Sequence, residues 1–183
     1  RKWDMSEGAG DGEINRPSGL AFDKDDNLYL VDSLNHRIQK FSKDGKFLSK
    51  WGTEGSGDGE FNMPWGIDLD AQGNVYIADW RNDRIQKFTS DGKHLASFGQ
   101  SGEGDGQFYR PSGVAVDSDG YIYVADWGNE RVQVLGPQGE FVTKLRGEAT
   151  LSKWAKNFLN INTEEAAARA TADLEMQIDY PVK

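Results

Sequence analysis

The stretch that decides the fold is RPSGLAFDKDDNLYLVDSLNHRI at residues 16–38. It returns as MPWGIDLDAQGNVYIADWRNDRI at residues 63–85 and as RPSGVAVDSDGYIYVADWGNERV at residues 110–132, so the copies start 47 residues apart. A fixed repeat of about 20 to 50 residues is typical of solenoids, propellers and other arrays in which each unit packs on its neighbours. The repeat therefore indicates an architecture. It says less about activity, because folds of this kind carry many unrelated functions.

Each copy of the repeat contains four short runs rich in β-branched and aromatic residues, which predict β-strands. In the first copy these runs are residues 20–22, 28–31, 38–41 and 47–51. Asp44-Gly45 separates the last two runs, and an Asp-Gly pair between strand-like runs favours a hairpin. We therefore expect an all-β chain built from four-stranded antiparallel units, which is the construction of a propeller blade.

The four runs differ in polarity. The first two runs of each copy are almost wholly apolar, as inner strands covered on both faces would be. The later runs of the first copy include Gln39, Lys40, Ser49 and Lys50. This mixture predicts outer strands whose polar side chains, Gln39 among them, face water.

The repeat resembles the NHL-repeat family of β-propellers. The resemblance rests on the Pro-x-Gly opening, the Tyr-centred second run that ends in Asp, the Asn-x-Arg-Ile/Val-Gln start of the third run, and the loop at residues 57–61. The Asn-His-Leu triplet that names the family is kept only in part, because Arg37 follows Asn35-His36 and the other copies have Asp83 or Glu130 in place of His. The resemblance covers residues 10–145 and implies three NHL-type blades of an expected six.

The phase of the repeat divides the chain into blades, with a different pattern at each end. Residues 1–15 resemble the end of a preceding blade and its linker. Apolar residues at helical spacing predict a C-terminal helical insertion between residues 148 and 179. The expected segments are 1–15, blade 1 at 16–62, blade 2 at 63–109, blade 3 at 110–147, the insertion at 148–179 and the start of a further blade at 180–183. Either further blades of a longer protein, which we favour, or a second copy of this chain would close the ring.

Composition limits the classes of function. The chain has 183 residues, a formal net charge of −9 and no cysteine, so disulfides and thiolate metal sites are excluded. No apolar run approaches the roughly 20 residues of a membrane-spanning helix. Lys and Arg are scattered and outnumbered by Asp and Glu, whereas a nucleic-acid binder usually carries a basic patch, so nucleic acid is not an expected partner. We expect no cofactor, and nothing in the sequence indicates a compartment.

Three sets of polar residues recur in every copy. They are Asp32, Asp79 and Asp126; Arg37, Arg84 and Arg131; and Asn35, Asn82 and Asn129. Recurring carboxylates suggest metal ligands, but repetition in every blade favours a structural part, because Asp and Asn bond backbone amides in turns and Arg pairs with carboxylates. A calcium-loop pattern at residues 23–34 is incomplete, since Leu28 and Leu34 stand where such a loop needs Gly and Glu. We therefore assign the three sets to the scaffold and expect no metal site.

Residues that break the repeat are better candidates for binding. Trp65 stands where the other copies have Ser, and Trp80 and Trp127 stand where the first copy has Ser33. Arg81 and Tyr109 depart from the pattern as well. By the layout of NHL propellers, the Pro-x-Gly openings and the Asp-x-x-Asn loops would lie on one face of the ring.

Trp and Arg are the residue types most enriched at binding hot spots. We therefore predict a ligand-binding group made of Trp65, Trp80, Arg81, Trp127 and the loop residue His36. The alternative is that these rings fill gaps between adjacent blades.

Two functions of different classes follow. The first is a binding or scaffolding module that holds a protein, peptide or glycan on its Trp-bearing loop face. The second comes from a resemblance to metal-dependent amidating lyases of the six-bladed class, whose histidines hold a metal in the central cavity. This chain has only His36 and His94, expected in opposite sets of loops, and no nucleophile–base pattern. A lyase or hydrolase would need catalytic residues outside this segment, so we assign no catalytic residue and favour the binding module.

Overall fold

The computed structural model describes residues 5–146. Every described residue belongs to one unit, Arg1–Gly147. The helical insertion expected at 148–179 and the further blade expected at 180–183 lie outside the described residues, as do residues 1–4 of the expected preceding blade.

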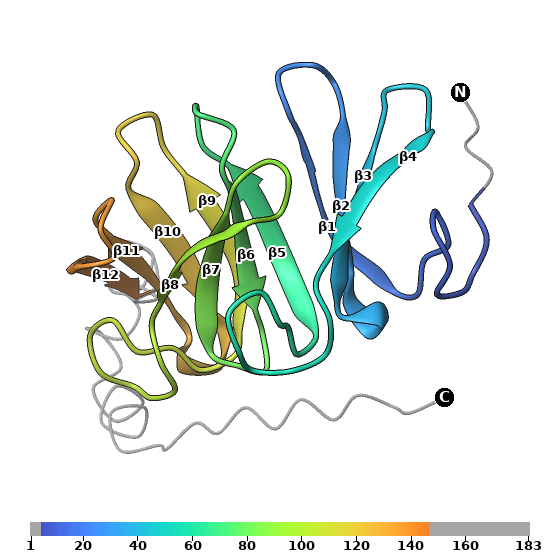
Figure 1. The fold of residues 1–183 in the computed structure, drawn as a ribbon. Coiled ribbons are helices and arrows are strands. Elements are labelled where there is room, and N and C mark those ends of the chain that lie inside the picture. Colours follow the sequence, from blue (N-terminus) through green and yellow to red (C-terminus); the bar gives the residue numbers. More distant parts are fainter. Residues whose placement is uncertain (1–4, 147–183) are drawn as a thin grey trace, which may run out of the picture. The chain divides into compact units, whose positions relative to one another are not determined.

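Three four-stranded antiparallel sheets make up the described unit (Figure 1). Within each sheet the strands lie in chain order, so each sheet is a meander of consecutive hairpins. Blade 1 consists of β1 (Pro17–Phe22), β2 (Leu28–Asp32), β3 (Arg37–Phe41) and β4 (Phe47–Trp51). Blade 2 consists of β5 (Pro64–Leu69), β6 (Val75–Asp79), β7 (Arg84–Phe88) and β8 (His94–Phe98). Blade 3 consists of β9 (Pro111–Val116), β10 (Ile122–Asp126), β11 (Arg131–Leu135) and β12 (Phe141–Arg146). The all-β class and the three NHL-type blades are confirmed.

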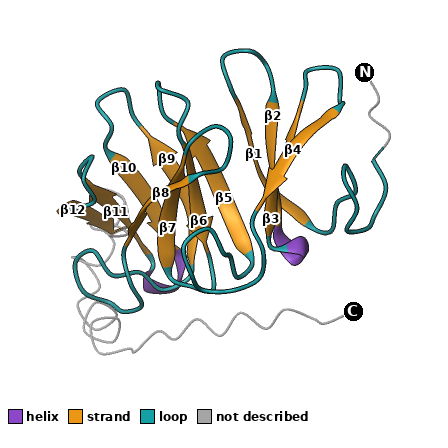
Figure 2. Ribbon diagram, in the orientation of Figure 1, coloured by secondary structure: helices purple, strands orange, loops and turns teal. Residues whose placement is uncertain are grey.

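Two short 3-10 turns, η1 (Ser33–Asn35) and η2 (Trp127–Asn129), are the helical elements of residues 5–146 (Figure 2). They follow β2 and β10, at the same end of the blades as the linkers that join one blade to the next. We call this end the linker face. The opposite end, which carries the β1–β2 and β3–β4 turns and their equivalents, is the turn face. Nothing helical in this part of the chain has the length and apolar character needed to cross a membrane.

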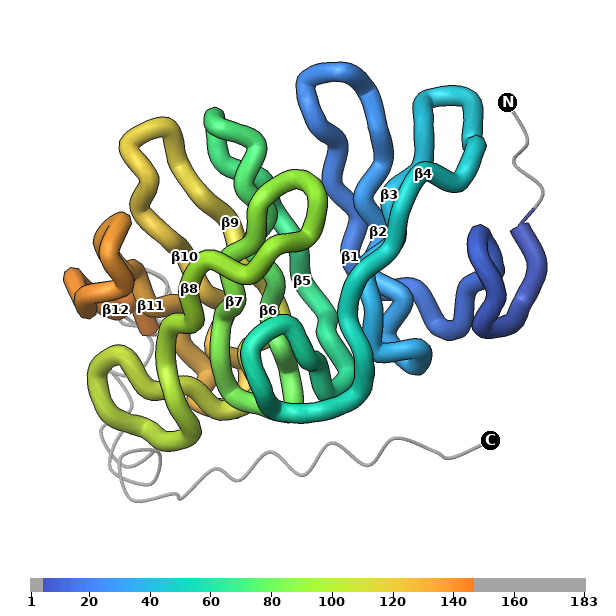
Figure 3. Tube along the Cα trace, in the orientation of Figure 1, coloured from blue at the N-terminus to red at the C-terminus, as the bar shows by residue number. Residues whose placement is uncertain are grey.

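The core lies between blades. Tyr29, Val31 and Ile38 of blade 1 pack against Ile67 and Ile77 of blade 2 in one buried cluster. A second cluster joins blade 2 to blade 3 in the same way. Figure 3 shows the chain tracing one blade after another, with β5 beside β1 and β9 beside β5. Because apolar burial is shared between sheets, each blade depends on its neighbour for stability.

Linker phenylalanines complete these clusters. Phe61 precedes blade 2 and is fully buried, with its ring centroid 5.5 Å from that of Phe88. Phe108 precedes blade 3 and is fully buried as well. The Gly-Asp-Gly linkers therefore do more than connect blades, because the residues that follow them insert an aromatic ring between sheets.

Two expectations about strand polarity need correction. Gln39 is 0% exposed, so the prediction that it faces water is wrong. Strand β2 is buried along its whole length as expected. Strand β1 was expected to be buried as well, but its Leu20 and Phe22 are 60% and 61% exposed. The equivalent of Leu20 in blade 2, Ile67, is only 8% exposed, because blade 1 covers it. Ring closure by further blades or by a second copy stays a prediction.

Candidate functional site

The linker face is built around one buried carboxylate per blade. In blade 2, Asp79 Oδ2 accepts hydrogen bonds from Arg84 Nε at 2.9 Å, Asn82 Nδ2 at 2.9 Å and Gln86 Nε2 at 3.1 Å. Its Oδ1 accepts from the backbone amide of Asn62 at 2.8 Å. Desolvation raises the pKa of Asp79 above its ordinary value, against the opposing hydrogen bonds and the charge of Arg84. A buried charge is stable only when paired and hydrogen-bonded in this way.

The partners of this carboxylate also hold the preceding linker. Arg84 Nη2 donates to the carbonyl oxygens of Gly57 at 2.8 Å and Glu60 at 2.9 Å. Gln86 Nε2 donates to the same Glu60 carbonyl at 2.7 Å, and its Oε1 accepts from the amide of Gly59 at 3.0 Å. The network therefore fastens the linker to the blade that follows it.

Blades 1 and 3 repeat the network. Asp32 and Asp126 are fully buried, and each accepts from the Arg five residues later at 2.8 Å and 2.7 Å. Gln39 and Gln133 take the position of Gln86. The glutamines belong to this set although the sequence analysis placed Gln39 in water. Their signal was available, because they recur at the same 47-residue spacing as the Asp and Arg.

His36 lies at a joint between blades. It occupies the left-handed region, with φ 52°, directly after η1. Its Nδ1 accepts a hydrogen bond from the amide of Met63 at 3.1 Å, at the start of blade 2. Asp83 does the same at the next joint, where its Oδ1 accepts from the amide of Arg110 at 2.7 Å. The geometry gives His36 a contact with the following blade, a role its counterpart Asp83 shares.

A pocket of about 360 Å³ opens on the linker face between blades 1 and 2. Blade 1 and its linker contribute Arg16, Pro17, Ser18 and Ser33, and blade 2 with its linker contributes Met63, Trp65, Trp80 and Arg81. We call this the Trp pocket. The rings of Trp65 and Trp80 meet edge to face, with centroids 5.2 Å apart and planes at 62°. Trp65 remains 41% exposed.

The pocket exists because of a difference between two blades. Blade 1 has Ser18 and Ser33 where blade 2 has Trp65 and Trp80. Ser33 Oγ donates to the carbonyl oxygen of Pro64 at 2.7 Å, and Ser18 Oγ lies 2.9 Å from the carbonyl oxygen of Trp65. These small side chains tie blade 1 to the backbone of β5 and leave room above it. The same positions in blade 2 supply the aromatic wall.

Guanidinium groups surround Trp80. The Cζ atom of Arg81 lies 5.6 Å from the Trp80 ring centroid, and that of Arg110 lies 4.4 Å from it. Both distances are within the range of cation–π attraction. Arg110 opens blade 3, so residues of two blades meet at this ring. Among residues 5–146, Arg16, Arg81 and Arg110 form no ion pair with a carboxylate, unlike the arginines of the buried networks.

The predicted binding group is thus brought together in part. Trp65, Trp80 and Arg81 line one pocket. Trp127 lies at the start of η2 and is 66% exposed, and within the described part of the chain its ring has no aromatic or cation–π partner. His36 is engaged with the Met63 amide. Sequence reasoning missed Arg16 and Arg110, which occupy equivalent positions at the starts of blades 1 and 3.

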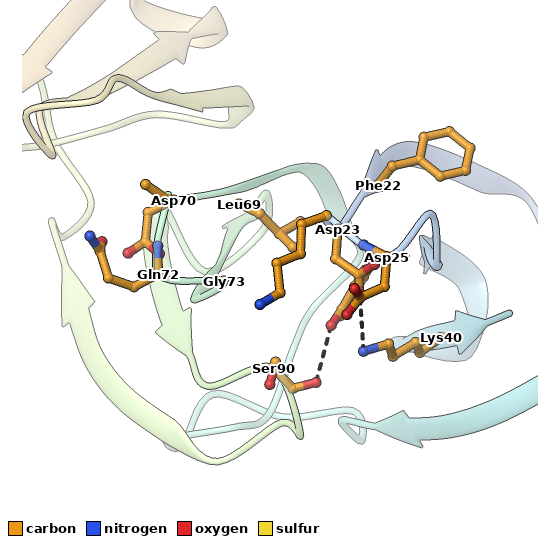
Figure 4. Close-up of a pocket in the computed structure, with 12 residues that line it drawn as sticks. Phe22, Asp23, Asp25, Lys40, Leu69, Asp70, Gln72, Gly73 and Ser90 are labelled. Carbon is orange, nitrogen blue, oxygen red and sulfur yellow. Dashed lines mark hydrogen bonds and ion pairs between the residues drawn. The ribbon is translucent and has the colours of Figure 1, made fainter. Parts of the chain in front are cut away.

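A second pocket, of about 400 Å³, lies on the turn face between the same two blades (Figure 4). Asp23, Asp25 and Asp70 line it, and the carboxylates of Asp23 and Asp70 each lie close to a lysine ammonium group. Asp23 Oδ2 lies 3.1 Å from Lys40 Nζ, and Asp70 Oδ2 lies 3.5 Å from Lys87 Nζ. Among residues 5–146, no group of three or more His, Cys, Asp or Glu is placed to hold a metal ion.

Asp23 is a turn residue. Burial raises its pKa, but hydrogen bonds from the side chain and amide of Asn27, from Lys40 and from the amide of Asp25 outweigh that effect and lower the pKa to about 2. The amides of Asp25 and Asn27 donate to Oδ1 at 3.0 Å and 2.9 Å. The calcium-like sequence at residues 23–34 therefore begins with an Asx turn in which the carboxylate caps its own loop.

Comparison with known proteins places this architecture in a family. The model of the SMP-30/Gluconolactonase/LRE-like region matches residues 9–100, half of the chain, and the NHL repeat model matches residues 108–135. The chain belongs to the SMP-30/Gluconolactonase/LRE-like family, and it carries an NHL repeat at residues 108–135. A curated relative, protein lin-41 of Caenorhabditis elegans, is 48% identical over 44 residues, which is 24% of this chain and 4% of that protein.

Solved structures show the same fold at low identity. A catalytically inactive virginiamycin B lyase from Staphylococcus aureus with quinupristin matches 79% of this chain and 44% of its own, with a TM-score of 0.59 and 17% identity. A streptogramin B lyase matches 72% and 40% of the two chains, with a TM-score of 0.56 and 18% identity. The RRP9 WD40 repeats match 72% and 38%, with a TM-score of 0.58 and 18% identity. This chain spans less than half of each, and these likenesses establish the propeller fold alone.

Proposed function

We propose that this propeller is a binding or scaffolding module that holds a protein or peptide in the Trp pocket of its linker face. One observation carries the proposal: two tryptophans of blade 2 stand edge to face in an open pocket of about 360 Å³, beside arginines without carboxylate partners in residues 5–146. Large aromatic rings with guanidinium neighbours are the typical composition of binding hot spots. The propeller likeness to the RRP9 WD40 repeats is compatible with such a role.

The proposal separates these tryptophans from rings that serve packing. Trp51 is a contrasting case, because it contacts Tyr29 and Phe88 inside the core between blades 1 and 2. Trp65 keeps 41% of its surface exposed. Leaving apolar surface in water forgoes about 25 cal/mol for each Å² that could be buried, so a partner that covers this ring would gain from it.

Among the ligand classes, the residues favour a protein or peptide over a glycan or a nucleic acid. Guanidinium groups recognise carboxylates by charge-assisted hydrogen bonds, which a neutral glycan does not offer. A nucleic acid would require a basic stripe that follows its phosphate backbone, whereas this chain has a net charge of −9 and the arginines that line the Trp pocket are Arg16 and Arg81.

The lyase or hydrolase alternative finds no support in the described residues. His36 bonds to the Met63 amide at one joint, and His94 starts β8 and lies 3.6 Å from Asp58. The likeness to the streptogramin and virginiamycin lyases is at 18% and 17% identity, respectively. A catalytic site of that class would have to be supplied by residues outside this part of the chain.

Selection of phage-displayed random peptides on the immobilised full chain tests the proposal. We expect enriched peptides whose affinity falls at least about thirtyfold on the variant Trp65→Ser/Trp80→Ser, the loss of a hot-spot contact. The matched control is Leu48→Ser/Leu95→Ser, which removes two apolar side chains with 45% and 46% exposure from the outer strands and should leave binding unchanged. Absence of enrichment, or equal binding to the Trp65→Ser/Trp80→Ser variant, would contradict the proposal.

A further inference from the structure

The charged residues that line the Trp pocket are positive, whereas the chain as a whole has a net negative charge. The sequence contains 30 Asp and Glu against 21 Lys and Arg. The residues that line the Trp pocket nevertheless include Arg16 and Arg81 and no carboxylate. The pocket on the turn face of the same two blades is lined by three carboxylates, Asp23, Asp25 and Asp70, and by two lysines, Lys24 and Lys40. The local excess of positive charge therefore belongs to the Trp pocket and not to the joint between blades in general.

The arginines beside Trp80 differ from the arginines of the buried networks. Arg37, Arg84 and Arg131 each pair with a buried Asp, at 2.7 to 2.9 Å. Arg81 and Arg110 instead both lie near the ring of Trp80, with Cζ–centroid distances of 5.6 and 4.4 Å, and Arg110 also lies 5.7 Å from the Tyr109 ring centroid. Cation–π attraction holds both guanidinium groups near one ring, and in the described residues neither of them forms an ion pair with a carboxylate, although the Asp83 carboxylate accepts from the backbone amide of Arg110. An anionic group bound there would relieve the repulsion between these two like charges.

The third guanidinium belongs to Arg16, on the opposite wall. Arg16 and Arg110 hold equivalent positions in the repeat, both with positive φ, at 53° and 57°. Met63 holds this position in blade 2 at φ 52°, so the conformation does not require Arg. Residues other than Gly, Asn, Asp and His are uncommon in this conformation, and Gly alone would serve the backbone. The Arg side chain is therefore not explained by the backbone it occupies.

From these observations we infer that the ligand of the Trp pocket is an acidic peptide segment, in which Asp or Glu carboxylates flank an aromatic or aliphatic side chain. The inference rests on the proposed function and names its ligand class. The carboxylates bind Arg16, Arg81 and Arg110, and the apolar side chain packs on Trp65 and Trp80. Guanidinium forks match carboxylates in shape as well as charge, so recognition is more specific than attraction to a point charge.

The test uses the selected peptides and three forms of the full chain. The first is the natural sequence, the second is Arg16→Gln/Arg81→Gln/Arg110→Gln, and the third is the control Lys24→Gln/Lys46→Gln/Lys93→Gln, which removes the same charge from exposed residues of the turn-face turns. We expect enriched peptides to carry an excess of Asp and Glu next to apolar residues. Their dissociation constant should rise at least about tenfold on the arginine variant, since three ion pairs are lost, and stay unchanged on the lysine control.

Two probes sharpen the result. A peptide with Gln in place of each Asp and Glu should bind the natural chain as weakly as the acidic peptide binds the arginine variant. A ten-residue oligouridylate should bind more weakly than the acidic peptide. Enriched peptides without acidic residues, which still need Trp65 and Trp80, would overturn this inference and leave the binding module intact. Tighter binding of the oligouridylate would overturn it in favour of a nucleic acid, and failure to enrich any peptide would remove the proposed function too.

Discussion

The buried carboxylate networks and the Trp pocket lie on the same face of the propeller, and they differ in how they relate to the repeat. Asp32, Asp79 and Asp126 hold the same partners in each blade, at the same spacing. The Trp pocket occurs where two blades differ, with Ser18 and Ser33 opposite Trp65 and Trp80. Residues that are identical in every blade build the joint between blades, whereas residues that differ between blades shape the surface of that joint.

The largest effect should come from breaking a network. Asp79→Ala leaves the partly buried Arg84 without its carboxylate and the amide of Asn62 without its acceptor, so we expect the free energy of unfolding to fall by about 3–5 kcal/mol. Urea denaturation followed by circular dichroism measures this loss. Asp58→Ala is the matched control, because the Asp58 side chain is 71% exposed, and it should change stability by less than about 0.5 kcal/mol. Equal effects at the two positions would remove the distinction between the network and other carboxylates.

An intermediate effect on stability should follow when Ser33 of blade 1 is replaced by the Trp that blades 2 and 3 have at the same position. Ser33 is 4% exposed and bonds to the Pro64 carbonyl, so Ser33→Trp overpacks the joint and should cost about 1–3 kcal/mol. It should also fill the Trp pocket and weaken peptide binding. The reverse exchange, Trp127→Ser, acts on a ring with 66% exposure and should stay within about 0.5 kcal/mol. A stable Ser33→Trp variant with full binding would show that the serines do not form the pocket.

The smallest effect concerns the Asx turn of blade 1. The pKa of Asp23 is lowered to about 2 from 3.8, so its ionised form stabilises the folded chain above about pH 4. That contribution is lost as the pH falls from about 4 to 2, and solvent screening keeps it below about 1 kcal/mol. Comparing the urea midpoints of the natural chain and Asp23→Asn at pH 6 and pH 2.5 measures it. The difference between the two proteins should shrink at the lower pH, and a difference that grows there would contradict the assignment.

The sequence was sufficient to predict the blades. A 47-residue period with four strand-like runs and Gly turns is compatible with few arrangements of strands. The three four-stranded sheets repeat with this period along the chain. Gln39 was misjudged because a polar residue on a later strand usually faces water. In the structure the Gln39 side-chain amide donates a hydrogen bond to the backbone carbonyl of Glu13 in the linker, at 2.6 Å. This partner becomes visible only once the path of the linker is known.

The candidate site was predicted only in part. The exchange of Ser for Trp singled out Trp65 and Trp80 from the sequence alone. Arg110 was missed because it belongs to blade 3 and contacts Trp80 of blade 2, with a Cζ–centroid distance of 4.4 Å. This contact depends on side-chain conformation, which the sequence does not show. His36 was expected in the binding group, but it holds a repeat position at which Asp83 and Glu130 have the same positive φ, so this place before the third strand recurs in every blade.

The central claim is that the two tryptophans of the Trp pocket, Trp65 and Trp80, serve a ligand and do not hold the blades together. Urea denaturation of the full chain with Trp65→Ser/Trp80→Ser, followed by far-ultraviolet circular dichroism, tests it most directly. A folded variant that loses no more than about 1 kcal/mol of unfolding free energy, while its affinity for selected peptides collapses, is the predicted result. An unfolded chain, or a loss of about 3 kcal/mol or more typical of a core aromatic residue, would contradict the account.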